Sequence, residues 1–190
     1  MEEELLTKAK EFEKINELSS EKIYTRGDKN AFLYWPEFGL KDLGRLGAWN
    51  AYYAENARDN PEKFKELLRK AVDDSLSKSE KIDASWEDIK YFGGDKTVAK
   101  KIIFCYYPEE VLPIFKTEHL KHFVSVLKLD FKKEAHDYSR SYDVLSVGQQ
   151  FELLNKLLLS YKGSIEKFKS WDNVLFMKFL YEHFPPFERE

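Results

Sequence analysis

The sequence has almost no cysteine and no long apolar run, and each absence excludes a class of protein. Cys105 is the single cysteine among 190 residues, which excludes an internal disulfide and any zinc or iron–sulfur site with several cysteine ligands. No window approaches about 18 uninterrupted apolar residues, the length of a membrane-spanning helix. The amino terminus, MEEELLTKAK, is acidic and lacks the apolar centre of a signal peptide. We therefore expect a cytoplasmic protein without membrane contact.

The motifs of familiar enzymes are also missing. The sequence contains no G-x-x-x-x-G-K-[ST] phosphate loop, no G-x-G-x-x-G, no H-E-x-x-H and no G-x-S-x-G. His119 and His122 stand three residues apart on a predicted helix, but a metal site needs a third ligand, which the sequence does not identify. Cys105 lies in an apolar run and is expected to be a small buried residue. We predict a non-enzymatic protein without metal or cofactor.

Charge of one sign is not in excess either. The chain has 31 basic and 34 acidic side chains, a formal net charge of -3, so it offers no general attraction to polyanions. Any contact with nucleic acid must then come from a local basic patch. The abundance of Lys and Glu is compatible with a protein from a heat-adapted organism.

Aromatic residues are the unusual component, at 16% of the chain. Their rings stabilise a core strongly when buried, and they also serve as platforms for nucleic-acid bases or protein partners. A chain of this length can bury roughly 70% of its unfolded surface, so a substantial core is expected.

Apolar residues recur at three- and four-residue steps along most of the chain, the period of an amphipathic helix. Asn60 and Asp95 are expected to cap the helices that follow them, and Pro61 to occupy a first helical position. A strand competes only at AFLYW and IIFCYY. The predicted helices cover residues 1–18, 40–58, 61–76, 79–91, 95–107, 117–129, 147–161 and 165–183.

This pattern predicts an all-α fold, a compact domain of roughly seven helices. Residues 130–146 are polar and contain tyrosine, and are expected to form a long loop. We expect residues 1–190 to make one helical domain, with 130–146 as the place for a subdomain break.

The glycine pair Gly93–Gly94 opens a helix that carries three lysines. Backbone amides at a helix start favour anions, so this segment could contact a phosphate. Asp95 opposes that interpretation, because its carboxylate would occupy the same amides and repel a phosphate. The end of the helix, IIFCYY, is apolar on every side and is expected to be buried. The three lysines are Lys96, Lys100 and Lys101.

The order of features over residues 91–129 can be compared with known families. A glycine turn leads into a helix that ends at a proline, and a short step leads into a second helix that closes near a leucine. The matching residues are Gly93, Gly94, Ala99, Ile102, Pro108, Pro113, Leu120 and Leu127.

This order resembles the helical segment that precedes the AAA+ GTPase motor in archaeal McrB-type restriction proteins. The upstream stretch NPEKFKELLRKAVDDSLS extends the resemblance to about residues 60–129, while Lys128 stands where a glycine is more usual. The resemblance implies a helical module that cooperates with a nucleotide-driven motor acting on foreign or modified DNA. The phosphate loop of the motor is absent from this sequence.

Residues 92–99 are also similar to a helix-hairpin-helix turn, which presents backbone amides to a DNA phosphate. The stretch departs from that pattern because its two glycines are adjacent.

The resulting hypothesis is a DNA-recognition or accessory module of a DNA-directed restriction system. Its lysines would form one solvent-facing cluster that contacts DNA phosphates, and exposed aromatic rings would stack on bases. DNA and an AAA+ motor are the expected partners. The alternative is a protein-interaction domain that docks a partner through the aromatic stretch AFLYWPEF. The candidate residues for DNA are Lys96, Lys100, Lys101, Lys116, Lys121, Trp35, Trp49, Tyr52 and Tyr53.

Overall fold

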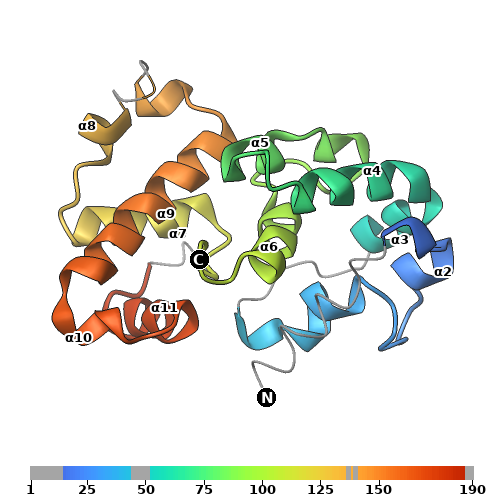
Figure 1. The fold of residues 1–190 in the computed structure, drawn as a ribbon, viewed down its shortest axis with the longest axis horizontal. Helices are drawn as coiled ribbons and strands as arrows, with labels where there is room; N and C mark the ends of the chain where they lie inside the picture. Colours follow the sequence, from blue (N-terminus) through green and yellow to red (C-terminus); the bar gives the residue numbers. More distant parts are fainter. Residues whose placement is uncertain (1–14, 44–51, 136–137, 139–140, 187–190) are drawn as a thin grey trace.

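The computed structural model describes residues 15–43, 52–135, 138 and 141–186. Every regular element in these ranges is helical, which confirms the all-α prediction (Figure 1). The α-helices are α2 (Ser20–Ile23), α3 (Tyr52–Asp59), α4 (Pro61–Val72), α5 (Lys78–Asp83), α6 (Thr97–Tyr106), α7 (Thr117–Val126), α8 (Phe131–Ala135), α9 (Val147–Ser164), α10 (Glu166–Lys169) and α11 (Asn173–His183). The 3₁₀ segments are η2 (Ile15–Glu17), η4 (Lys41–Leu43), η5 (Trp86–Asp88) and η7 (Tyr142–Val144), and η3 (Trp35–Gly39) is a π-helix.

Helix α9 organises the C-terminal part of the molecule. It packs against α5, α7, α8 and α10, and Figure 1 shows it alongside α7. Phe151, Leu154 and Leu158 are fully buried and follow one another at three- and four-residue steps, so they form the apolar stripe that these neighbours cover.

Among the described residues, none of the helices combines the length and the apolar composition that a membrane-spanning helix requires.

Helix α6 joins this part to the N-terminal helices. It packs against α4, α5 and η3 and lies between the two groups of helices in Figure 1. All side chains of residues 98–105 are buried, from Val98 at 5% exposure to Cys105 at 4%. The prediction that the end of this helix belongs to the core is confirmed.

Many of the aromatic residues that the structure describes are buried in the core. Phe92 is 1% exposed, and its ring lies 5.9 Å from the Trp86 ring, 6.0 Å from Phe64 and 5.5 Å from Tyr53. Edge and offset contacts of this kind contribute about 0.5–1.5 kcal/mol each beyond the area that they bury. Residues from α3, α4 and η5 are therefore joined around one phenylalanine.

Several predicted boundaries were wrong. The expected loop 130–146 contains α8 and η7, and the expected helix 165–183 is divided into α10 and α11. The division has a local cause, because Asp172 caps α11 by accepting a hydrogen bond from the Leu175 amide at 2.6 Å. The predicted helix 1–18 lies outside the described residues apart from 15–18.

Two predicted caps were also wrong, although Pro61 does begin α4. Asn60 donates its side-chain amide to the Asn56 carbonyl at 2.9 Å and does not cap α4. Lys96, not Asp95, is the residue before α6, and it has a left-handed backbone with φ of 51°.

Gly148 permits the close approach of α9 to α5. A Cβ atom at this position would lie 2.3 Å from the Ser79 carbonyl oxygen and 2.7 Å from the Asp83 carboxylate. Asp83 also accepts a hydrogen bond from the Gly148 amide at 2.9 Å, so it satisfies one of the free amides at the start of α9. Gly163, on the same helix, has no atom within 4 Å of such a Cβ.

We expect Gly148→Ala to lower the free energy of unfolding by about 1–3 kcal/mol, because the two helices must move apart. Gly163→Ala is the matched control and should raise it by up to about 1 kcal/mol through helix propensity. Urea unfolding of both variants tests this difference. Equal effects of the two substitutions would contradict the proposed close packing.

Candidate functional site

The lysine cluster expected to face solvent is not present. Lys100 and Lys101 are 0% exposed, which contradicts the prediction that they contact phosphates. A lysine side chain has a long apolar stem, so it can be buried where its ammonium group finds acceptors.

Lys100 finds its acceptors on segments before and after α6. Its ammonium group donates to Asp95 Oδ1 at 2.6 Å, Thr117 Oγ1 at 2.8 Å and the Phe115 carbonyl at 3.2 Å. Asp95 Oδ2 accepts the Thr117 amide at 2.8 Å, so this carboxylate serves the start of α7 and not that of α6. Burial lowers the pKa of Lys100, and the Asp95 charge acts in the opposite direction. All three ammonium hydrogens are used within the fold.

Lys101 is buried on another side of α6. Its ammonium group lies 5.6 Å from the centre of the Phe115 ring. Burial lowers its pKa to about 8, against the attraction of Glu37 and Asp42. The charge of Lys101 is therefore held at an unfavourable site.

Sequence reasoning missed a third buried lysine, Lys81. Its ammonium group donates to the carbonyls of Ala71 and Asp73 at the end of α4 and to Tyr107 Oη at 2.9 Å. A cation is favourable at a helix C-terminus, where carbonyl groups lack partners. In the sequence, only the position of Lys81, nine residues after the end of α4, hints that it could return to that helix end. Spacing alone does not predict this contact.

The other three predicted lysines do not share an interaction partner among the described residues. Lys96 pairs with Glu87 at 3.1 Å, and Lys121 lies 4.9 Å from the centre of the Tyr142 ring. Lys116 is exposed just before α7. The predicted convergence of five ammonium groups on one surface is therefore wrong.

The predicted aromatic residues differ in exposure. Tyr53 is 3% exposed and donates its hydroxyl to Glu37 at 2.5 Å, so it is a core residue and no base can stack on it. Trp35 is half-buried and donates its indole N–H to the Lys29 carbonyl at 3.0 Å. Trp49 lies outside the described residues. Tyr52 is 50% exposed and remains a candidate.

Tyr52 pairs with a residue that sequence reasoning did not select, Tyr91. Tyr91 is 58% exposed, and the two ring centres are 6.0 Å apart with an angle of 31° between their planes. The ammonium group of Lys90 lies 5.2 Å from the centre of the Tyr91 ring. We call Tyr52 and Tyr91 the tyrosine pair.

The backbone at Tyr91 is strained. Its φ is 72°, a left-handed conformation that is uncommon for a bulky side chain. Two neighbours explain why the chain turns here, because Ile89 and Phe92 are both anchored in the core at 0% and 1% exposure. Gly94 also has a positive φ, of 64°, which glycine adopts freely. The turn therefore directs one large ring into the core and its neighbour into solvent.

A second aromatic contact lies at η3, within the stretch proposed for docking, and one of its rings is exposed. Tyr34 and Phe38 have ring centres 5.5 Å apart, and Phe38 is 50% exposed. A Cβ atom at Gly39 would lie 2.2 Å from the Trp35 ring, so glycine is needed for this π-helix to close over the indole. The Tyr53–Glu37 hydrogen bond connects η3 to α3, the helix that begins with Tyr52.

The two histidines that were considered as metal ligands have structural partners. His119 Nδ1 lies 2.9 Å from Tyr181 Oη, and His122 Nε2 lies 3.1 Å from the Phe184 carbonyl. Within the described ranges, no three His, Cys, Asp or Glu residues are grouped as a metal site would require. Cys105 is buried, which raises the pKa of its thiol to about 12 and confirms its place in the core.

Comparisons with protein-family models, with curated proteins and with solved structures find no match for this chain.

Lys101 should make stability depend on pH. As the pH rises from 8 to about 10 the folded protein releases this proton, while most of the unfolded chain, with a pKa of 10.5, retains it. The unfolded state then binds more protons, so the free energy of unfolding should rise with pH, by about 1–2 kcal/mol across this window. In Lys101→Met the rise should be smaller. Urea unfolding at pH 7, 8, 9 and 10 compares the original chain with Lys101→Met. Identical pH profiles of the two proteins would contradict the low pKa of Lys101.

Proposed function

We propose that the chain is a cytoplasmic helical interaction domain that docks a protein partner through the tyrosine pair. The observation that carries this proposal is the exposed ring of Tyr91 on a left-handed backbone, next to the exposed ring of Tyr52. Phe38 on η3 is a further exposed ring, and the Tyr53–Glu37 hydrogen bond connects η3 to the helix that begins with Tyr52.

The stability of the fold does not explain why position 91 is a tyrosine. A left-handed conformation costs a non-glycine residue about 1–2 kcal/mol relative to its right-handed form, and a glycine would avoid that cost. The Tyr91 ring returns little to the core, because more than half of its surface is in solvent and Phe92 occupies the adjacent buried position. Strained residues with exposed functional groups are typical of binding sites.

The surroundings of the tyrosine pair indicate the chemistry of the partner. Two adjacent phenol rings offer apolar faces with polar edges, a combination enriched at protein interfaces. Lys90 is exposed beside Tyr91 and makes no ion pair with any described residue. A partner segment with apolar side chains and a nearby carboxylate would complement both groups.

Contact with DNA has less support than contact with protein. Tyr52 and Lys116 are exposed, but Lys100 and Lys101 are buried, and the net charge of -3 supplies no general attraction to phosphates. The resemblance of residues 60–129 to McrB-type restriction proteins makes an AAA+ motor subunit a candidate protein partner. Through such a motor the domain would act in DNA restriction without binding DNA itself.

The double variant Tyr52→Ala, Tyr91→Gly tests the proposal. The full chain, immobilised, should retain a partner protein from an extract of its native cells, and the double variant should lose it. Leu175→Ala, which truncates a side chain that is 45% exposed on α11, is the control and should retain the same partner. Affinity of the purified partner should change little between low and high salt, because apolar docking is weakly screened.

Stability measurements distinguish a loss of docking from a loss of folding. Tyr91→Gly alone should leave the free energy of unfolding unchanged or raise it by about 1 kcal/mol, because relief of backbone strain offsets the lost ring contact. A loss of more than about 2 kcal/mol would show that the ring serves folding and would remove the argument for docking. Retention of DNA that falls steeply with salt, without any protein partner, would favour the DNA hypothesis instead.

A further inference from the structure

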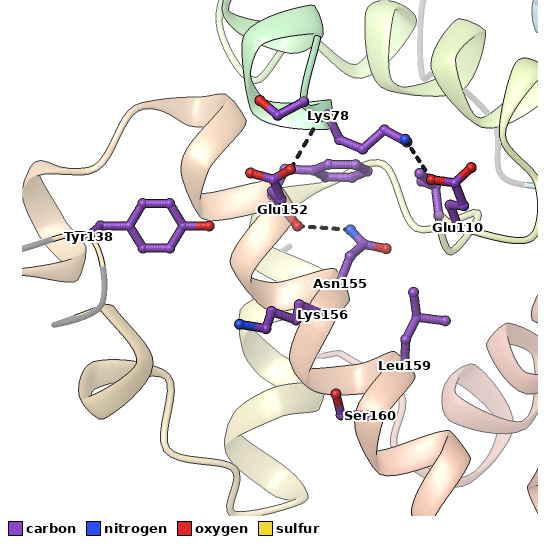
Figure 2. Close-up of a pocket in the computed structure, with 11 residues that line it drawn as sticks. Lys78, Glu110, Tyr138, Glu152, Asn155, Lys156, Leu159 and Ser160 are labelled. Atoms are coloured by element: carbon purple, nitrogen blue, oxygen red, sulfur yellow. Dashed lines mark hydrogen bonds and ion pairs between the residues drawn. The ribbon is translucent and has the colours of Figure 1, made fainter. Parts of the chain in front are cut away.

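An open pocket of about 610 Å³ lies between the start of α5, the turn after α6 and the middle of α9 (Figure 2). Its volume is within the range of small-molecule sites, about 300–1,000 Å³. This pocket is built from residues that the tyrosine pair does not use.

Helix α9 lines the pocket with two neighbouring rows of side chains, each with a four-residue step. Positions four apart lie on one face of an α-helix, so each row forms a continuous strip. The first row is Phe151, Asn155 and Leu159, and the second is Glu152, Lys156 and Ser160.

The floor of the pocket is fixed by Asn155. This residue is 4% exposed, accepts a hydrogen bond from the Leu112 amide at 2.8 Å and donates one to the Phe151 carbonyl at 2.9 Å. It therefore ties the chain after α6 to α9. Among the apolar lining residues, Leu159 is half-buried and supplies surface, while Val111 and Phe151 are 1% and 0% exposed.

Charged groups stand around this floor, and they are only partly paired. Lys78 donates its ammonium group to Glu110 Oε2 at 2.7 Å and its backbone amide to Glu152 Oε1 at 3.2 Å. Figure 2 shows Lys78 between these two carboxylates. The second oxygen of each carboxylate has no hydrogen bond to any described residue. The same holds for the Lys156 ammonium group and the Ser160 hydroxyl.

We propose that this pocket binds a small zwitterion with an apolar side chain, the chemical class of a free apolar amino acid. Two lysines and two glutamates line the site, so its net charge is zero and it does not favour a polyanion. A ligand carboxylate would meet Lys156, and a ligand ammonium group would meet the open oxygen of Glu152, one helical turn away. The ligand side chain would lie against Leu159.

Titration calorimetry on the full chain tests the proposal with L-leucine and L-phenylalanine as probes. Both should bind with saturation, and phenylalanine amide and N-acetylphenylalanine should each bind about tenfold or more weakly, because each lacks one charge. Failure of both amino acids to bind would overturn the proposal. Equal binding of the amide or the N-acetyl form would also overturn it.

Three variants locate the binding. Lys156→Gln should weaken phenylalanine binding about tenfold, since it removes the charge but keeps most of the side chain. Lys132→Gln removes an exposed lysine on α8 and should bind as the original chain does. Leu159→Trp should block binding by filling the pocket, with circular dichroism used to verify the fold. Unchanged affinity in Lys156→Gln would place the ligand elsewhere and contradict the assigned site, whatever the result for the tyrosine pair.

Discussion

The ion pair between Asp95 and Lys100 joins the turn before α6, α6 itself and the start of α7. Asp95 follows the glycine turn, Lys100 lies in α6, and both bond to Thr117 at the start of α7. The Lys100 ammonium group also lies 5.2 Å from the centre of the Phe151 ring, on α9. A charge without solvent requires such acceptors, so these four segments have to assemble together.

Both proposed sites depend on this assembly. Tyr91 lies four residues before Asp95, so the anchored turn maintains the strained backbone that exposes its ring. The chain between α6 and α7 is bonded to Lys100 at Phe115 and to Asn155 at Leu112, and it forms one side of the pocket. The proposed partner surface and the proposed pocket are therefore both connected to the segments that Asp95 and Lys100 join.

The periodicity of apolar residues predicted the helices well, because it reports which face of a helix is buried. It did not predict which polar residues join the core. Lys100 has acceptors 5, 15 and 17 residues away, and Lys81 has one 26 residues away, so their burial depends on tertiary contacts. Tyr91 and Phe92 have similar side chains and opposite positions, and the left-handed φ of Tyr91, 72°, marks the turn where they diverge. Sequence spacing contains no information on that angle beyond the glycines that follow.

We infer that Lys100 is stable in the core only with Asp95 beside it. A double-mutant cycle with Asp95→Ala and Lys100→Met, measured by urea unfolding of the full chain at pH 7, tests this directly. We expect Asp95→Ala alone to lower the free energy of unfolding by about 3 kcal/mol, and the added Lys100→Met to restore at least about 1 kcal/mol of it. Additive effects, or a loss below about 0.5 kcal/mol for Asp95→Ala, would contradict the claim.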